Sequence, residues 1–316
     1  MGGCPAPQEQ TVMKQVKPDY FDRFACIKGD CRHSCCIGWE IDIDEASYAR
    51  FQRVRGELGN KLKSVIKDGD DGPCFAMTAD GRCPFLNGDG LCDLIIELGE
   101  DCLCQICDDH PRFRSFFSDR EEIGLGLCCE AAARLILANP DRVCLLEEGC
   151  EELEDEEKEL LVLRAELIKI MQDRSAPAEK RVQRMLDYAE LEFAPDVLRW
   201  AGFLLTLEHL EEAWTQRVER LAAAEEIPQP ETTEESENAF EQLMVYLLCR
   251  HLPMALEDDD LAGHILYCVL IWHVVRAMIA QAGFSMDEMV EICREYSAEI
   301  EYSDENIAAI LDEMNA

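Results

Sequence analysis

The sequence predicts a mainly α protein, in which a cysteine-rich, metal-binding N-terminal region of short strands and loops packs on a C-terminal helical bundle. Three observations lead to this fold class. Cysteines crowd the first half of the chain, and apolar residues recur at helical spacing through the second half. Hydrophobic residues make up 48% of the 316 residues, which is enough for a large core and argues against global disorder.

The chain is strongly acidic, with a net charge of −36. Nucleic acids and anionic membranes are polyanions, so both are expected to be repelled rather than bound. A basic or lysine-bearing protein is the partner that this charge favours. The same charge also has a simpler use, because self-repulsion keeps a protein soluble.

Eighteen cysteines are many for a chain of this length. No basic segment followed by an apolar run stands after Met1, so no export signal is recognised and a reducing cytoplasmic location is expected. Clustered thiols in that compartment favour metal or redox chemistry over disulfides.

The densest group of cysteines lies between Cys26 and Cys36, with the spacing C-x4-C-x3-C-C. Gly29 and Gly38 permit the sharp turns that a metal-binding loop needs. Further along the chain, more thiols follow that are candidates for the same site. Together the candidate ligands are Cys26, Cys31, Cys35, Cys36, Cys83, Cys92, Cys107 and Cys129.

The elements around these cysteines alternate between extended runs and helices. Asp44 is suited to cap a helix over residues 45–66. Cys83 and Cys92 flank the turn at residues 87–90 and are expected to approach one another on a short hairpin. Helical spacing then predicts helices over residues 93–108 and 130–138, the first ending near Cys107 and the second starting after Cys129.

Beyond residue 145 the pattern becomes helical, so we predict two domains, a cysteine-rich domain at 1–144 and an all-helical domain at 145–316. The acidic stretch 147–159 is interpreted as a solvated helix face, or as a docking patch for a basic partner. The apolar run at residues 265–275 is shorter than the roughly 20 residues that span a bilayer, so it is interpreted as a core helix and no transmembrane segment is predicted. The other helices are predicted at 160–171, from 176, at 197–224, 238–256, 260–283 and 285–300, and from 303.

Thiolates bind zinc or iron–sulfur clusters, usually four to a site. The spacing departs from zinc ribbons and fingers, and adjacent cysteines such as Cys35 and Cys36 rarely ligate one ion together. One of the two then packs, or two sites share the region. His33, His110 and Arg112 neighbour the cluster as further candidates, and their simpler role is structural. Buried thiols without a ligand role are expected at Cys74, Cys102, Cys104, Cys128, Cys144 and Cys150.

Other catalytic patterns are missing from the sequence. There is no glycine-rich phosphate loop, no G-x-G-x-x-G after a strand and no G-x-S-x-G. A nucleotide-binding Rossmann domain is therefore not predicted, and the sequence singles out no catalytic base and no cofactor-binding residue.

Several motifs together resemble the flagellin lysine-N-methylase family, and the resemblance extends from about residue 17 to the C-terminal helices. The first comprises Phe24 and the cysteines from Cys26 to Cys36, followed by Gly38-Trp39. The others are Cys83-Pro84-Phe85-Leu86, Gly90-Leu91-Cys92, Leu98-Gly99-Glu100, Cys107 with Pro111-Arg112, Leu125 to Glu130, and Tyr246 to His251. The chain departs from the family pattern at His110, where an aromatic residue is usual, and at Cys128, which adds a thiol.

The resemblance implies methyl transfer from S-adenosylmethionine to lysine ε-amines of a protein such as flagellin. It also implies a cysteine-bound [4Fe–4S] cluster, with zinc as the alternative metal, and the eight candidate cysteines are the positions that match. Two other readings stay open at this point. One is a non-enzymatic zinc- or iron-chelating protein with a helical interaction domain, and the other is a thiol-redox protein that uses Cys35 and Cys36.

Overall fold

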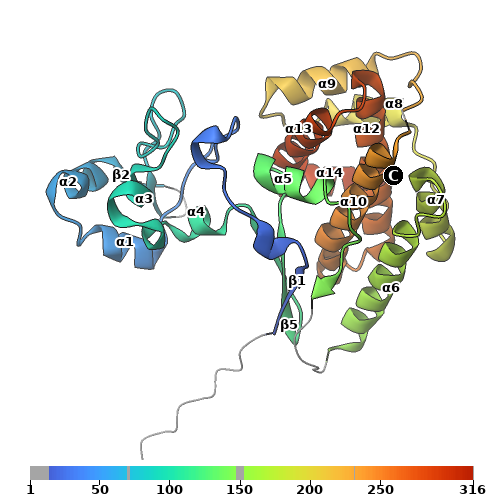
Figure 1. The fold of residues 1–316 in the computed structure, drawn as a ribbon, viewed down its shortest axis with the longest axis horizontal. Coiled ribbons are helices and arrows are strands. Elements are labelled where there is room, and N and C mark those ends of the chain that lie inside the picture. Colours follow the sequence, from blue (N-terminus) through green and yellow to red (C-terminus); the bar gives the residue numbers. More distant parts are fainter. Residues whose placement is uncertain (1–13, 70–71, 147–152, 231, 316) are drawn as a thin grey trace, which may run out of the picture.

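The computed structural model describes residues 14–69, 72–146, 153–230 and 232–315. It is mainly α-helical with a few short strands, which confirms the predicted class (Figure 1). Cys150 and the first part of the acidic stretch 147–159 lie outside the described residues. The predicted domain boundary at 144/145 stays a prediction.

Short elements make up the first half of the described chain. The predicted helix over 45–66 is two helices, and the turn between them ends at Gly56, whose φ of +79° suits glycine. The helix predicted over 93–108 breaks in the same way after Gly99, at a φ of +91°. The helical elements are η1 (Phe21–Arg23), η2 (Lys28–Asp30), α1 (Glu45–Phe51), α2 (Gly56–Val65), α3 (Asp93–Leu98), η3 (Glu100–Cys102), α4 (Gln105–Asp109) and α5 (Glu130–Leu137).

The strands form two small sheets. The larger has the order β4-β5-β1-β6, with β1 parallel to β5 and the other pairs antiparallel. Strand β1 was not predicted from the sequence, because its partners come from about 100 residues further along the chain. The strands are β1 (Lys14–Pro18), β2 (Ile66–Asp68), β3 (Pro73–Phe75), β4 (Arg112–Phe116), β5 (Arg120–Leu125) and β6 (Leu145–Leu146).

The second half is a helical bundle. The helix predicted over 197–224 is split into α8 and α9, because the buried Glu299 carboxylate accepts hydrogen bonds from the backbone amides of Leu210 and Glu211 in the connecting loop. The helical elements are α6 (Asp155–Met171), α7 (Ala178–Tyr188), α8 (Val197–Leu204), α9 (Glu212–Ala222), α10 (Glu234–His251), η4 (Leu252–Met254), α11 (Ala255–Asp258), α12 (Leu261–Ala282), α13 (Met286–Tyr296), the π-helix η5 (Ser297–Glu301) and α14 (Asp304–Met314).

Helix α12 forms the centre of the bundle. It has 22 residues and contains the apolar run 265–275 that was interpreted as a core helix, and by length and composition alone it is long enough to cross a membrane. Within the structure, 67% of its most apolar stretch is buried against other helices. Trp272 on this helix is fully buried and donates its indole N–H to the carbonyl of Phe240.

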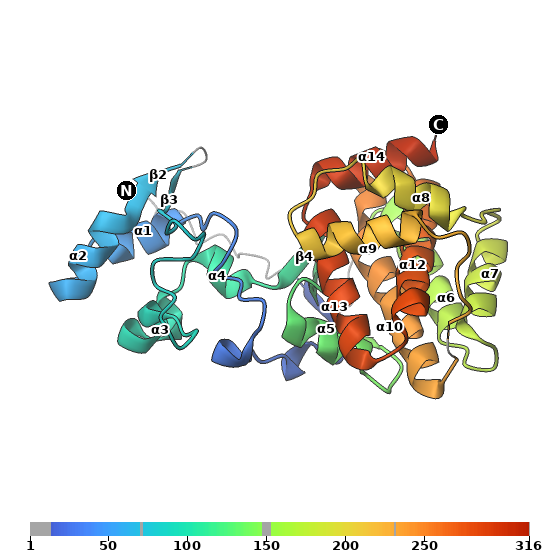
Figure 2. The same cartoon turned by 90° about the horizontal axis from the view of Figure 1, so that it is seen from above.

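Two large hydrophobic cores and one small cluster around Phe117, Leu160 and Ala255 organise the described residues. The largest is built from β5, α5 and most of the helices from α6 to α14. The other large core, which we call the cysteine core, joins Ile41 and Ile43 to Phe51, Phe75 and Phe85 and to several cysteines. In both views, α1–α4 lie to one side of the bundle (Figures 1 and 2), so the predicted packing of the cysteine-rich region on the bundle is not confirmed.

Candidate metal centre

Four of the eight candidate cysteines meet at the cysteine core, and we call them the thiol tetrad. They are Cys36, Cys83, Cys92 and Cys107. The backbone amide of Cys83 donates to the carbonyl of Cys36 at 2.7 Å. An antiparallel bridge between Leu86 and Cys92 closes the expected hairpin, and α4 contributes Cys107. Segments some 70 residues apart in sequence thus place their thiols on one small core.

The charges of the tetrad thiols act on one another, in all six pairs. Burial, and then the neighbouring thiols, raise the pKa of Cys83 to about 12. The same causes raise the pKa of Cys92. A hydrogen bond from Cys35, with further help from Ser34 and Arg82, lowers the pKa of Cys36 to about 7. One thiolate is therefore available near neutral pH, and a bound cation would favour ionisation of the other three.

Three further candidates form a second group, the thiol triad of Cys26, Cys31 and Cys129. Burial raises the pKa of Cys129, and the charges of Cys31 and Cys26 add to this effect. Cys129 is the N-cap residue of α5, and the backbone of Ala131 and Ala132 in the first turn opposes the effect of burial on its pKa. Cys26 and Cys31 flank η2 in the N-terminal loop, and Cys26 is exposed.

Ion pairs hold the triad loop on the helical region. Arg32 donates its backbone amide and its Nε to the carboxylate of Glu130, at 3.1 and 2.9 Å. His33 pairs with Glu291 of α13 at 3.0 Å. The triad therefore joins the N-terminal loop to the bundle, whereas the tetrad belongs to the cysteine core.

Cys35 lies between the two groups. Its pKa is raised first by the hydrogen bond with Cys36, then by burial and by the charges of Cys36, Cys26 and Cys107. Cys128 faces away, because its thiol is hydrogen-bonded to Tyr302. Cys74, Cys102 and Cys104 are buried, and Cys104 is hydrogen-bonded to Cys107.

The other residues suggested as neighbours have structural partners. Burial, and then the Arg112 charge, lower the pKa of His110 to about 4. Arg112 donates to the carbonyl of Asp108 at 2.7 Å and stands over the rings of Phe21 and Phe24. His33 is the partner of Glu291 rather than of a sulfur.

The donor chemistry of the tetrad fits a thiophilic metal, since four sulfurs is the usual number for zinc or an iron–sulfur cluster. Among the residues that the structure describes, however, no three His, Cys, Asp or Glu side chains are already arranged as ligands of one ion. The fit therefore rests on which thiols are brought together, and no coordination geometry follows from it.

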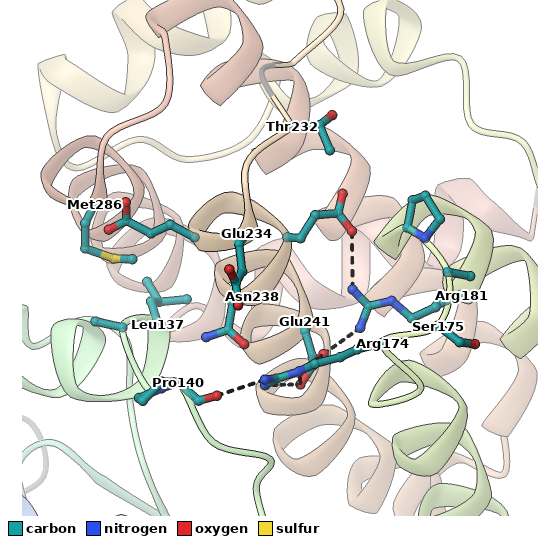
Figure 3. Close-up of a pocket in the computed structure, with 15 residues that line it drawn as sticks. Leu137, Pro140, Arg174, Ser175, Arg181, Thr232, Glu234, Asn238, Glu241 and Met286 are labelled. Atoms are coloured by element: carbon teal, nitrogen blue, oxygen red, sulfur yellow. Dashed lines mark hydrogen bonds and ion pairs between the residues drawn. The ribbon is translucent and has the colours of Figure 1, made fainter.

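Sequence reasoning missed a cavity of about 750 Å³ in the helical region (Figure 3). On its wall the buried Glu241 accepts hydrogen bonds from Arg174 and Arg181. The exposed Glu234 and Glu235 also line it, and carboxylates outnumber guanidinium groups, so the cavity favours a cation. Its residues come from four separate segments, which no local pattern connects.

A second feature missed from the sequence is a buried polar network at the π-helix η5. The fully buried Glu301 accepts hydrogen bonds from Tyr246 at 2.7 Å and from Ser297 at 2.5 Å, and it pairs with His251 at 2.8 Å. Burial would raise the pKa of Glu301, but the Arg250 charge and the His251 hydrogen bond outweigh it and lower that pKa to about 2. The π-helix η5 is the structural feature that marks this network, and a π-helix cannot be recognised from the sequence.

Fold and thiols together define a class of thiol-rich, mainly α proteins. Comparison with known families narrows this class. The family described as FliB lysine N-methylase C-terminal domain matches residues 125–316, which is more than half of the chain. The chain therefore belongs to this family, and the resemblance inferred from the motifs is confirmed.

Individual relatives match a shorter part of the chain than the family model does, at 26–28% identity. The chain is 28% identical over 144 residues to the lysine-N-methylase of Salmonella typhimurium strain LT2, a match that covers 43% of this chain and 36% of that protein. It is 26% identical over 142 residues to the flagellar biosynthetic protein FliU of Salmonella muenchen, covering 42% of this chain and 84% of that protein. The chain thus spans about a third of the length of the first relative. No solved structure matches.

Proposed function

We propose that this chain acts as a protein-lysine N-methyltransferase that uses S-adenosylmethionine and carries an iron–sulfur cluster on the thiol tetrad. The observation that carries the proposal is the family match over residues 125–316, together with the name of the relatives. The tetrad adds a chemical argument, because its four thiols are the donor set of such a cluster.

The residues that would hold the cluster are Cys36, Cys83, Cys92 and Cys107. When bound, an iron–sulfur cluster supplies one-electron chemistry and iron as a Lewis acid. The low pKa of Cys36 provides the first thiolate. Cys83 is buried and the other three thiols are partly buried on the cysteine core, which limits their contact with bulk water.

The proposed substrate is a lysine-bearing protein such as flagellin, in line with the name of the FliU relative. The net charge of −36 attracts a cationic side chain and accelerates its encounter with the protein. A lysine ε-ammonium must lose a proton before its nitrogen can accept a methyl group directly, so a base is required in the complex.

The test is methyl transfer with anaerobically reconstituted protein, flagellin and methyl-labelled S-adenosylmethionine, read as ε-N-methyllysine by mass spectrometry. Cys83→Ala is expected to abolish labelling. Cys74→Ala is the matched control, since Cys74 is equally buried in the same region but outside the tetrad. Equal labelling by wild type and by Cys83→Ala would contradict a role of the tetrad cluster in methyl transfer. No labelling of flagellin by the wild type would contradict flagellin as the substrate.

A second candidate function is a non-enzymatic metal-binding protein with a helical interaction domain. The specific observation in its favour is the number of thiols in the tetrad, because four protein ligands complete the coordination of a structural metal ion. The metal content after anaerobic purification distinguishes this function from the methyltransferase. Brown protein with iron and acid-labile sulfide supports the cluster, whereas colourless protein with stoichiometric zinc supports the structural role.

A further inference from the structure

We propose that the cavity of about 750 Å³ in the helical region is a docking site for a lysine-bearing segment of the protein substrate (Figure 3). The proposal rests on the proposed function for the kind of partner, a protein that is recognised through its lysine side chains. It goes beyond that function because it separates the place where the substrate docks from the thiols. The occupant is a short peptide segment with one lysine side chain inside the cavity.

The cavity has the size of a ligand site and lies away from the candidate cysteines. Pockets that bind ligands have volumes of about 300–1,000 Å³, so this one has room for a lysine side chain and its neighbours. None of the described residues that line it is a cysteine. Leu137 lines the cavity at the end of α5, whereas Cys129 caps the opposite end of this eight-residue helix, about 12 Å away at 1.5 Å per residue. A segment bound in the cavity is therefore held at a distance from the thiols.

The edge of the cavity offers two carboxylates to a cation. Glu234 and Glu235 are exposed in the first turn of α10, and within the described ranges no ion pair or side-chain hydrogen bond engages either of them. The buried Glu241 differs, because Arg174 and Arg181 already neutralise its charge. The uncompensated negative charge thus lies at the exposed edge, where it attracts an ammonium group.

Part of the cavity wall is apolar, as the stem of a lysine side chain requires. The side chains of Leu137, Pro140 and Met286 lie along one side of the cavity, across from Arg181 (Figure 3). Lysine side chains bury their methylene groups along apolar surface and keep the ammonium among polar groups. Apolar residues beside exposed carboxylates are the complement of such a side chain, whereas a bare metal cation would leave the apolar side unused.

Two polar atoms in the wall favour a peptide over a free amine. The Nε of Arg181 has no hydrogen-bond partner in the described part of the chain, although this residue is only 2% exposed. The Oδ1 of Asn238 is likewise buried and unpartnered there, while its Nδ2 donates to the carbonyl of Asn139. One donor and one acceptor match a peptide group, which carries one carbonyl and one N–H. A diamine has no acceptor for Arg181.

Isothermal titration calorimetry of the full chain tests the proposal. The first probe is a capped pentapeptide with one lysine between glycines. The second is the same peptide with norleucine, which keeps the stem and lacks the ammonium. The lysine peptide is expected to bind, more weakly as the salt concentration rises, and the norleucine peptide should bind about tenfold more weakly. Equal binding of the two peptides, or no binding of the lysine peptide, would overturn the proposal.

Three variants assign the binding to the cavity. Glu234→Gln with Glu235→Gln should weaken binding of the lysine peptide about tenfold. Ser175→Trp fills the cavity from an exposed position on its wall, so it should weaken binding without changing a charge. Asp304→Asn with Glu305→Gln removes two exposed acids from the first turn of α14 and is the matched control, with wild-type affinity expected. Wild-type affinity in either cavity variant, or an equal loss in the control, contradicts the site.

A free diamine distinguishes a peptide segment from a small amine. Putrescine should bind more weakly than the lysine peptide, and tighter binding of putrescine would overturn the peptide assignment. None of these titrations reads methyl transfer. Binding of the lysine peptide without methylation of flagellin would therefore contradict the proposed activity and support the docking site, whereas methylation without peptide binding would contradict the docking site alone.

Discussion

The cysteine core and the helical core are held together by different means. The helical core buries long apolar helices against one another around α12, with Trp272 and Tyr267 fully buried at its centre. The cysteine core has short elements, a few aromatic side chains such as Phe75 and Phe85, and thiols in place of further apolar residues. Small cores of this kind usually need a metal or disulfides for stability. The comparison teaches that the thiols serve the fold of one region as well as its chemistry.

Metal removal has the largest expected effect on this difference. A thiophilic chelator should unfold the cysteine core, with a loss on the order of 10 kcal/mol as in structural zinc modules, and leave the bundle folded. Hydrogen exchange checks this, with α1–α4 losing protection while α10 and α12 keep theirs. Restoring the metal should reverse the loss. Equal loss of protection in both regions would show that the cores are not independent.

Truncation at the centre of the bundle has the next largest effect. Trp272→Ala should lower the free energy of unfolding by about 3–5 kcal/mol, since it leaves a cavity and removes the hydrogen bond from the indole to the Phe240 carbonyl. Urea denaturation followed by circular dichroism measures it, and Trp272→Phe is the milder control. Metal content should stay at the wild-type value, and its loss would mean that the bundle supports the cysteine core directly.

The buried Glu301 network makes the stability of the bundle depend on pH. The folded-state pKa of Glu301, about 2, lies below its ordinary value, so its contribution is present above pH 4.5 and is lost as pH falls towards 2. Glu301→Gln should cost about 3 kcal/mol at neutral pH and flatten the loss of stability between pH 4.5 and 2. Unfolding free energies measured across this range test it. The exposed Glu305→Gln should behave like wild type.

The smallest effects come from one helix cap in each region. Asp44 accepts hydrogen bonds from the amides of Ser47 and Gln105, both at 2.9 Å, and so caps both α1 and α4. Asp196 caps α8 through the amide of Arg199. Asp44→Ala and Asp196→Ala should each cost about 1–2 kcal/mol, confined to their own region. Region-resolved hydrogen exchange compares them, and an effect of either cap on the opposite core would contradict two separate units.

Local rules predicted the features that depend on near neighbours. The cap at Asp44, the hairpin between Cys83 and Cys92 and the helix after Cys129 all follow from short-range patterns, and the structure contains each of them. The division of the candidate thiols into the tetrad and the triad did not follow from these short-range patterns. Spacing brought Cys26 and Cys36 into one loop, but the structure assigns one to the bundle side and the other to the cysteine core.

The sequence by itself determined the mainly α class, the family and the identity of the eight candidate thiols, because composition, periodicity and motif spacing are properties of neighbouring residues. Tertiary structure decided which thiols stand together, where long helical patterns break and which charges are buried. Glu299 ends one predicted helix from about 90 residues away, and Arg32 reaches Glu130 across 98 residues. Such contacts depend on the three-dimensional path of the chain, and no local pattern encodes them.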